Sequence, residues 1–135
     1  LLVMTTSFLY LISLSMKPYQ DARVEGEKLA KQYAELEQAD QVDFYNGLEG
    51  YYSVLGRNKK QEAIAVLIEK NDHKIYVYQL DKGISQDKAA TISREKGASD
   101  IDKITFGRYQ DKPIWEVKSG NQYYLVDFET GAVIQ

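Results

Sequence analysis

Ser85 and Lys88 are the residues whose types and spacing come nearest to a catalytic motif. They stand in the order S-x-x-K, in which the serine of one class of acyltransferases attacks its substrate. Such enzymes also need a Lys-Thr-Gly segment, and this chain has Glu129-Thr130-Gly131 instead. An acid at that position repels a substrate carboxylate rather than holding it. We therefore expect Ser85 to cap a helix rather than to act as a nucleophile.

The other residue types that commonly do chemistry are scarce. The chain has no cysteine and one histidine, His73, so Cys-His catalysis, disulfides and a His-rich metal site are excluded. His73 stands in Asn71-Asp72-His73-Lys74, a segment typical of a solvated turn. Acidic pairs occur at other predicted turns, where such side chains commonly bond their own backbone: Asp100 with Asp102, and Asp127 with Glu129. The sequence thus predicts no catalytic, cofactor-binding or metal-binding residue, and no enzyme activity.

Tyrosine is unusually frequent, with 11 in 135 residues. Tyr76 and Tyr78 alternate with apolar residues in one predicted strand, and Tyr123 and Tyr124 begin another. A sheet that faces water on one side shows polar residues at every second position, and these strands do not. Either a helix covers one face and a neighbouring domain the other, or the tyrosines form an exposed platform for a protein partner. On the second interpretation Tyr76, Tyr78, Tyr123 and Tyr124 are candidate partner-binding residues.

These strands belong to an internal repeat. Residues 75–83 align without gaps on residues 123–131, an offset of 48, and each copy ends in an acidic residue two positions before a glycine. The alignment extends back to 65–67 and 113–115, so a strand, a polar turn and a second strand occur twice. Two copies are too few for a solenoid. We therefore expect two small tandem domains.

Each domain is predicted to be a helix followed by antiparallel strands, which is an α+β arrangement. In the first, 17–82, the apolar helical face consists of Ala22, Gly26, Leu29, Tyr33 and Leu36. Its strands are predicted at Val42–Tyr45, Tyr51–Leu55, Ala63–Ile68 and Ile75–Leu80.

The second domain, 83–135, has a helix predicted at Gln86–Lys96, capped by Ser85 and ended by Gly97. Its strands are predicted at Lys103–Tyr109, Pro113–Val117 and Tyr123–Phe128, with a final short run at Ala132–Ile134. Domains this small bury only about 60% of their unfolded surface. We therefore expect the two to pack against each other.

The segment Leu1–Met16 differs from the rest because it carries no charge, and all 17 Lys and Arg residues follow it. As a helix it rises about 24 Å, short of the roughly 20 residues that cross a bilayer. Because the chain opens on Leu, we expect upstream residues that complete a single-pass membrane anchor, with the domains on the extracytoplasmic side. A signal peptide cleaved near Ser13-Leu14-Ser15 and a buried core helix are the alternatives.

The order of motifs in the second domain resembles that of a known family. An alanine-bearing helix, Ala89-Ala90-x-Ile92, precedes Trp115-Glu116-Val117 and then the segment 124–133 with its Asp-x-x-Thr-Gly turn. From Gly83 to Gln135 this order resembles a PepSY domain, a small extracytoplasmic module of bacteria. The whole chain, with its hydrophobic start, its helix and the segment 51–56, is similar to the membrane-anchored cell-wall elongation regulators of Gram-positive bacteria called TseB.

The TseB resemblance implies a cystatin-like double domain outside the membrane, without catalysis or cofactor. It also implies that the chain regulates peptidoglycan synthesis by contacting a protein partner, such as a penicillin-binding transpeptidase. The PepSY resemblance implies the alternative, a module that restrains a secreted or membrane peptidase. The net charge of −3, with both signs interspersed, gives no indication of nucleic-acid binding.

Overall fold

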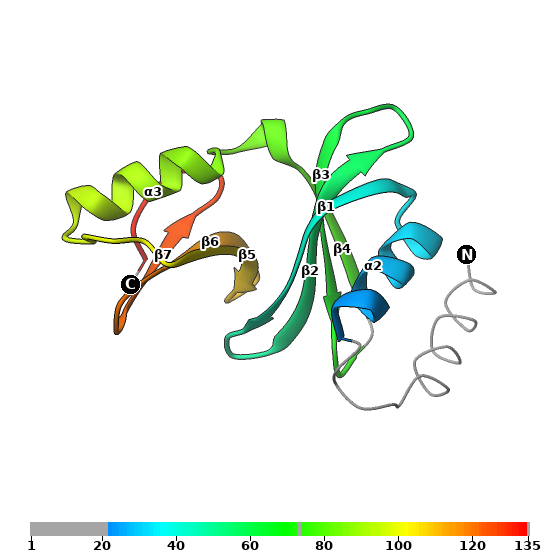
Figure 1. Ribbon diagram of the computed structural model, residues 1–135, viewed down its shortest axis with the longest axis horizontal. Helices are drawn as coiled ribbons and strands as arrows, with labels where there is room; N and C mark the ends of the chain where they lie inside the picture. The colour runs from blue at the N-terminus through cyan, green and yellow to red at the C-terminus, as the bar shows by residue number, and fades with distance from the viewer. Residues whose placement is uncertain (1–21, 73, 135) are drawn as a thin grey trace.

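The computed structural model describes residues 22–72 and 74–134, which form two antiparallel sheets with a helix beside each (Figure 1). The elements of the first sheet and its helix are α2 (Ala22–Tyr33), β1 (Leu36–Asn46), β2 (Gly50–Asn58), β3 (Ala63–Glu69) and β4 (Ile75–Gln79). A short 3₁₀ helix, η2 (Leu80–Lys82), leads to the second group: α3 (Gln86–Glu95), β5 (Lys103–Tyr109), β6 (Lys112–Ser119) and β7 (Gln122–Asp127).

The first sheet has the strand order β1-β2-β3-β4, and all of its neighbours are antiparallel. Leu29 and Ala30 of α2 are fully buried against one face, in a cluster with Val54 of β2 and Val66 of β3. These two valines lie opposite each other in the β2–β3 register. Every residue of β3 after Ala63 is buried. Burial on successive residues means that both faces of the strand are covered.

The second sheet has the order β5-β6-β7, and α3 packs on β6 and β7. The predicted cap is confirmed, because the Ser85 hydroxyl accepts a hydrogen bond from the Lys88 amide at 3.0 Å. The predicted end is confirmed too, since Gly97, with φ of +118°, lies just past the helix. The helix-facing side of this sheet holds Trp115, 2% exposed, whose indole donates to the Ile84 carbonyl at 3.0 Å.

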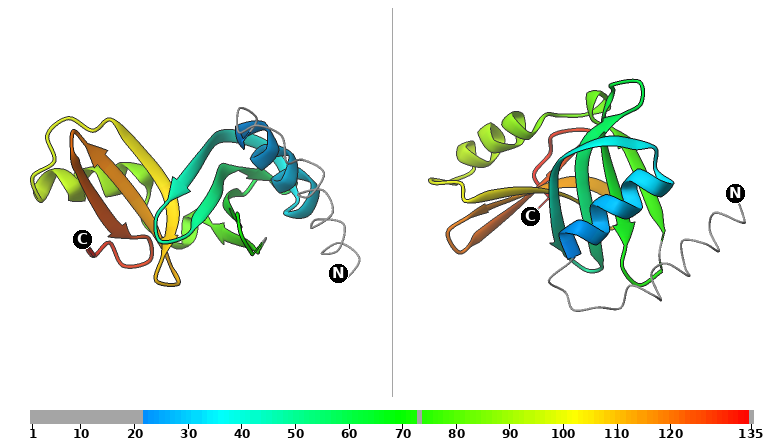
Figure 2. Two further views of the ribbon diagram at one scale, coloured as in Figure 1. Left: turned by 90° about the horizontal axis from the view of Figure 1, so that it is seen from below. Right: turned by 45° about the vertical axis from the view of Figure 1, so that its right-hand side comes forward.

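The second sheet meets the first with its edge strand, β5, which contacts β1, β2 and β3 (Figure 2). On one side of β5, the Phe106 ring lies 5.7 Å from that of Tyr78, measured between centroids. On the other side, Gly107 lies against the Tyr45 ring so closely that a β carbon at Gly107 would come within 2.6 Å of it. One hydrophobic cluster therefore contains residues of both sheets, from Tyr45 on β1 to Trp115 on β6.

The predicted helical face is wrong at Leu36. Helix α2 ends at Tyr33, and Glu35, with φ of +57°, turns the chain so that Leu36 begins β1. Leu36 is 3% exposed and reaches the same cluster as Leu29, although from a strand. The pairing of β1 with β2 begins at Leu36, opposite Asn58. This strand pairing replaces the helical hydrogen bonds that the apolar spacing alone suggests.

The predicted strand at Ala132–Ile134 is also wrong. Val133 forms only an isolated bridge with Val126. Gly131, with φ of +82°, directs the chain back across β7, and the Ile134 amide donates to the Leu125 carbonyl at 2.7 Å. The segment contacts one strand at a few points and forms no ladder.

The α+β class is confirmed by the two antiparallel sheets and two helices. Division into tandem cystatin-like domains at 17–82 and 83–135 stays a prediction. The anchor expected at Leu1–Met16 lies outside the described residues. Among residues 22–72 and 74–134, no helix is both long and apolar enough to cross a bilayer.

Candidate functional site

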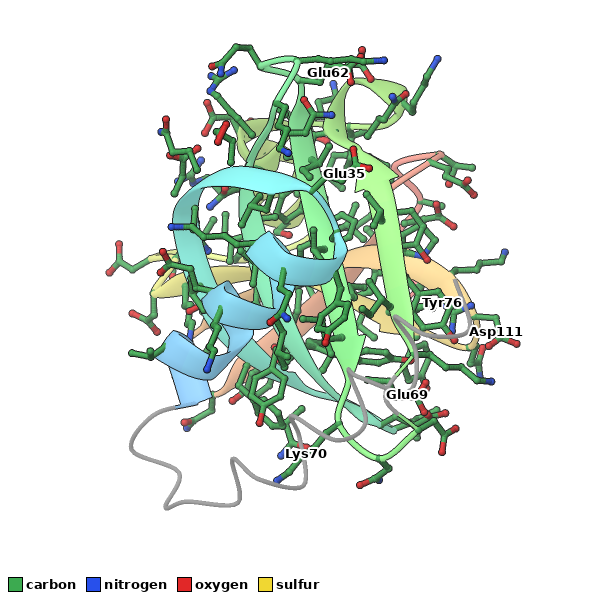
Figure 3. All side chains as sticks on the ribbon, turned by 90° about the vertical axis from the view of Figure 1, so that its right-hand side faces the viewer. Glu35, Glu62, Glu69, Lys70, Tyr76 and Asp111 are labelled. Atoms are coloured by element: carbon green, nitrogen blue, oxygen red, sulfur yellow. The ribbon has the colours of Figure 1, made fainter. Side chains whose placement is uncertain are left out.

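The predicted tyrosines lie in two different places, and the first pair is at the junction of the sheets. Tyr76 and Tyr78, both half-buried, pack against the shared cluster. The Arg108 side chain of β5 joins them, because its Nε donates to the Tyr78 hydroxyl at 3.1 Å and its guanidinium lies 4.0 Å from the centre of the Tyr76 ring. Arg108 also pairs with Asp111 at 3.3 Å, and Tyr76 and Asp111 are neighbours in Figure 3.

The second pair lies on β7 and points to opposite faces of the second sheet. Tyr124 is half-buried and packs against the shared cluster. Tyr123 is 53% exposed on the face away from α3. The structure thus does not gather the four tyrosines into one platform, and of the four only Tyr123 is exposed.

Tyr123 lines a groove of about 490 Å³ between the open face of the second sheet and the edge of the first. The groove residues are Phe44, Asn46, Lys103, Thr105, Glu116, Lys118 and Tyr123. Phe44 comes from β1 and is 36% exposed, while β5, β6 and β7 supply the opposite wall. The groove therefore exists only because the two sheets are joined.

The charged residues of the groove are held in place by neighbours. The Lys103 ammonium lies 3.2 Å from the Asp43 carboxylate of β1, and this ion pair crosses from one sheet to the other. Gln41 strengthens the same junction by donating to the Ile104 carbonyl at 3.2 Å. Burial raises the pKa of Glu116, and the nearby Lys103 opposes that shift. The lining residues thus include two aromatic residues, two cations and one acid, which suits recognition of a polar, charged surface.

Two of the acidic residues considered from the sequence accept hydrogen bonds from backbone amides in turns. The Asp127 carboxylate accepts from the amides of Glu129 and Thr130 at 2.8 and 3.1 Å, as expected of an acid in a turn. The Asp102 carboxylate accepts from the Gly120 amide at 2.9 Å. His73 lies outside the described residues.

The groove was not found from the sequence, except for Tyr123. Its residues lie on four strands from both sheets, and their proximity depends on how β5 docks against β1. One signal was available in β6, where Glu116 and Lys118 alternate with buried residues and so mark a face open to water.

Comparison with known proteins identifies the family. A family model described as "Cell wall elongation regulator TseB-like domain" matches residues 25–69, from α2 to the end of β3. A relative described as "Probable cell wall elongation regulator TseB", from Bacillus subtilis (strain 168), is 34% identical over 143 residues, which cover 95% of this chain and 88% of the relative. The chain belongs to the TseB-like family. The TseB resemblance stated from the sequence is confirmed.

A solved structure extends the likeness over both sheets. The YpmB protein from Bacillus subtilis matches with a TM-score of 0.69 at 32% identity, over 90% of this chain and 97% of that chain. The match by family model ends with β3. It includes β1, the strand that supplies Phe44 to the groove. The wall formed by β5, β6 and β7 lies beyond it.

Proposed function

We infer that this member of the TseB-like family is a non-catalytic binding module, anchored in the membrane with residues 17–135 outside the cytoplasm. It regulates peptidoglycan synthesis through contact with another protein. Membership of a family named for cell wall elongation supports the cell-wall role. The groove between the sheets is the observation that carries the binding role.

The groove has the composition of a protein-binding surface. Tyr123 and Phe44 expose 53% and 36% of their surface, and large aromatic residues are frequent among the residues that contribute most to binding. Lys103 and Lys118 lie beside them and give the partner's acidic or carbonyl groups a place to bind. Because the Lys103–Asp43 pair and the Tyr45 contact hold the two walls together, the surface is already formed before binding.

The partner that best fits this role is a penicillin-binding transpeptidase or another protein of the peptidoglycan-synthesising machinery. The relative's name specifies elongation of the wall, and elongation requires transpeptidation of new peptidoglycan. A regulator without catalysis acts on that step by binding the enzyme that performs it.

Site-specific crosslinking in cells tests the partner and the surface together. A photoreactive phenylalanine replaces Tyr123 in the full chain, and the matched control carries it at Lys88, an exposed residue on α3. Helix α3 covers the opposite face of the same sheet. We expect a transpeptidase to be captured from position 123 and not from position 88. Capture of a peptidase instead would favour the alternative role of restraining a peptidase.

The proposed topology is tested separately. Protease added to intact, wall-stripped cells should digest residues 17–135 while a cytoplasmic marker protein survives. Protection of these residues in cells whose cytoplasm stays sealed would contradict an extracytoplasmic location.

A further inference from the structure

The edges of the two sheets differ in how far they are covered. In the part of the chain that the structure describes, β5 docks against the first sheet, and β7 is bridged by the segment after Gly131 through Val126 and Val133. The first sheet ends in β1 and β4, of which β4 has five residues and β1 has eleven. Strand β1 therefore offers the longest open edge.

Backbone hydrogen bonds reveal which groups of β1 face outward. The Lys70 amide donates to the Gly50 carbonyl at 2.9 Å, so Gly50 turns its carbonyl away from β1, to the side of β3. Gly50 stands opposite Asn46 in the β1–β2 register. In an antiparallel pair, residues whose backbone groups point at each other alternate with residues whose groups point apart. The amides and carbonyls of Asn46 and, two residues earlier, Phe44 therefore point away from the sheet.

These outward groups lie at the groove. Phe44 and Asn46 are the two residues of β1 that line it. Among residues 22–72 and 74–134, none forms a hydrogen bond with their backbone amides or carbonyls. The β1–β2 register is regular from Gln41 to Asn46, a length of roughly 17 Å at about 3.4 Å per residue. An edge of this kind is a template for one more strand.

The opposite wall of the groove supplies side-chain contacts for such a strand. The Lys103 and Lys118 side chains are 53% and 40% exposed. The Lys118 ammonium lies 3.9 Å from the Asp102 carboxylate, which is too long for a hydrogen bond, so it is available to another acid. Tyr123, also exposed, adds an aromatic surface. The wall therefore suits an extended segment that carries an acidic side chain beside an apolar one.

A second copy of this chain fits the edge poorly. Strand β1 itself carries Glu37, Asp40 and Asp43, and the whole chain has a net charge of −3. Two copies paired through this edge would place these acids close together, and like charges across neighbouring strands are destabilising. The occupant that fits is therefore a segment of a different protein.

We propose that the partner adds an extended segment of about five residues to the open edge of β1, as a further strand of the first sheet. An acidic side chain of this segment is directed to Lys103 and Lys118. Hydrogen bonds to the backbone of Phe44 and Asn46 supply affinity, and the lysines supply specificity. This mode of binding rests on the groove being the partner-binding surface, and it specifies how the partner is held there.

Proline in place of Asn46 tests the main-chain contact. Asn46→Pro removes one outward amide, and proline is tolerated on an edge strand where the N–H faces away from the sheet. Asn46→Ala is the matched variant, because it removes the same side chain and keeps the amide.

Val77→Pro is the control on the other edge of the first sheet. The Glu69 amide donates to the Lys74 carbonyl at 2.8 Å, so Lys74 turns its backbone towards β3. Val77 is three residues further along, and its amide therefore points outward in the same way as that of Asn46. Val77 does not line the groove.

The readout is the yield of crosslinks in cells from a photoreactive phenylalanine at position 123 of the full chain. We expect Asn46→Pro to lower the yield at least about tenfold, because a carbonyl of the partner loses its donor. Asn46→Ala should lower it less, and Val77→Pro should leave it unchanged. The melting temperature of each purified variant shows whether it is folded.

Amide hydrogen exchange decides the question even if Asn46→Pro does not fold. The purified full chain is mixed with the purified protein that position 123 captures. The amides of Phe44 and Asn46 should then exchange at least about tenfold more slowly than in the free chain, because each becomes hydrogen-bonded. The Val77 amide should exchange as before.

The possible failures can be told apart. Equal crosslink yields in folded Asn46→Pro and Asn46→Ala, or unchanged exchange at Phe44 and Asn46, would overturn strand addition and leave the proposed function standing. An absence of crosslinks from position 123 in the otherwise wild-type chain would contradict the groove as the binding surface, and strand addition with it. Capture of a second copy of this chain would overturn the choice of occupant.

Discussion

The first sheet is covered on both faces, by α2 and by β5, whereas the second is covered by α3 on one face and is open over much of the other. The difference can be read in one strand of each. Strand β3 is apolar and buried at every position from Ile64 to Ile68, while β6 alternates buried Trp115 and Val117 with half-buried Glu116 and Lys118. A strand covered twice needs apolar residues at every position, and a strand covered once needs them at every second position.

The comparison also explains where the groove lies. The open face of the second sheet begins where contact with the first ends, beside Gly107 and Tyr45. Residues beyond that contact, Thr105, Glu116 and Tyr123, form the groove wall. The junction therefore both stabilises the protein and shapes its candidate binding surface, so changes there test the two roles together.

Removal of the Trp115 side chain should have the largest effect. The ring is 2% exposed and lies 4.9 Å from that of Phe106, measured between centroids, in the cluster that both sheets share. Trp115→Ala should cost about 3–5 kcal/mol of unfolding free energy. Calorimetry should show one transition that moves as a whole. Two separate transitions, of which only one moves, would mean that the sheets unfold independently.

A side chain added at the contact between the sheets should lower the unfolding free energy by somewhat less than Trp115→Ala does. Gly107→Ala places a methyl group within 2.6 Å of the ring of Tyr45, a residue that is 1% exposed. Overpacking of this kind costs about 1–3 kcal/mol. Urea unfolding measures the loss, and combination with Tyr45→Ala should cancel most of the Gly107→Ala penalty. Additive effects of the two changes would contradict direct contact.

The hydrogen bond between Arg108 and Tyr78 should contribute a smaller amount. Tyr78→Phe removes the hydroxyl that accepts from Arg108 Nε, at a cost of about 1–2 kcal/mol. Tyr123→Phe is the matched control on the open face, and it should change stability by less than about 0.5 kcal/mol. Equal effects of the two changes in urea unfolding would place the two tyrosines in similar environments, contrary to the structure.

The smallest expected effect is the pH dependence of the unfolding free energy that Glu116 of the groove contributes. Because burial raises the pKa of Glu116 above its unfolded value, the folded chain binds more protons than the unfolded chain between those two values. The stabilisation from protonated Glu116 is complete below the unfolded pKa and is lost as pH rises through the folded pKa. Unfolding free energies measured from about pH 4 to pH 7 should therefore fall less steeply in Glu116→Gln. Parallel curves for the variant and the wild type would show that Glu116 ionises as it does in water.

The repeat predicted both hairpins but not their relative register. Offset by 48, the β3–β4 pair Leu67 and Tyr76 corresponds to Trp115 and Tyr124, yet Trp115 pairs with Val126. The second hairpin is thus shifted by two residues. A shift of two keeps every side chain on its face, so the alternating pattern that revealed the repeat is the same in both registers.

Local signals located other elements closely. Strand β5 has the predicted bounds, Lys103–Tyr109, and Ser85 and Gly97 mark the ends of α3. Each signal depends on residues that are neighbours in the chain: a hydroxyl three residues from an amide, or a glycine at a positive φ. Leu36 shows the limit, because helical spacing and strand pairing competed for it and a partner strand about twenty residues away decided the outcome.

The sequence by itself determined the α+β class, most strands, the cap of α3 and the family, because these depend on periodicity, turn chemistry and motifs within short stretches. Only the tertiary structure decided which tyrosines are exposed, since Tyr76 and Tyr123 stand in similar patterns and differ in what packs on them. It alone placed Phe44 and Tyr123 around one groove, and brought carboxylate oxygens of Glu49, Glu69 and Asp72 within 4.8 Å of one another. Those residues come from separate strands and loops, and their distances follow from strand pairing and from the docking of β5, which no local pattern encodes.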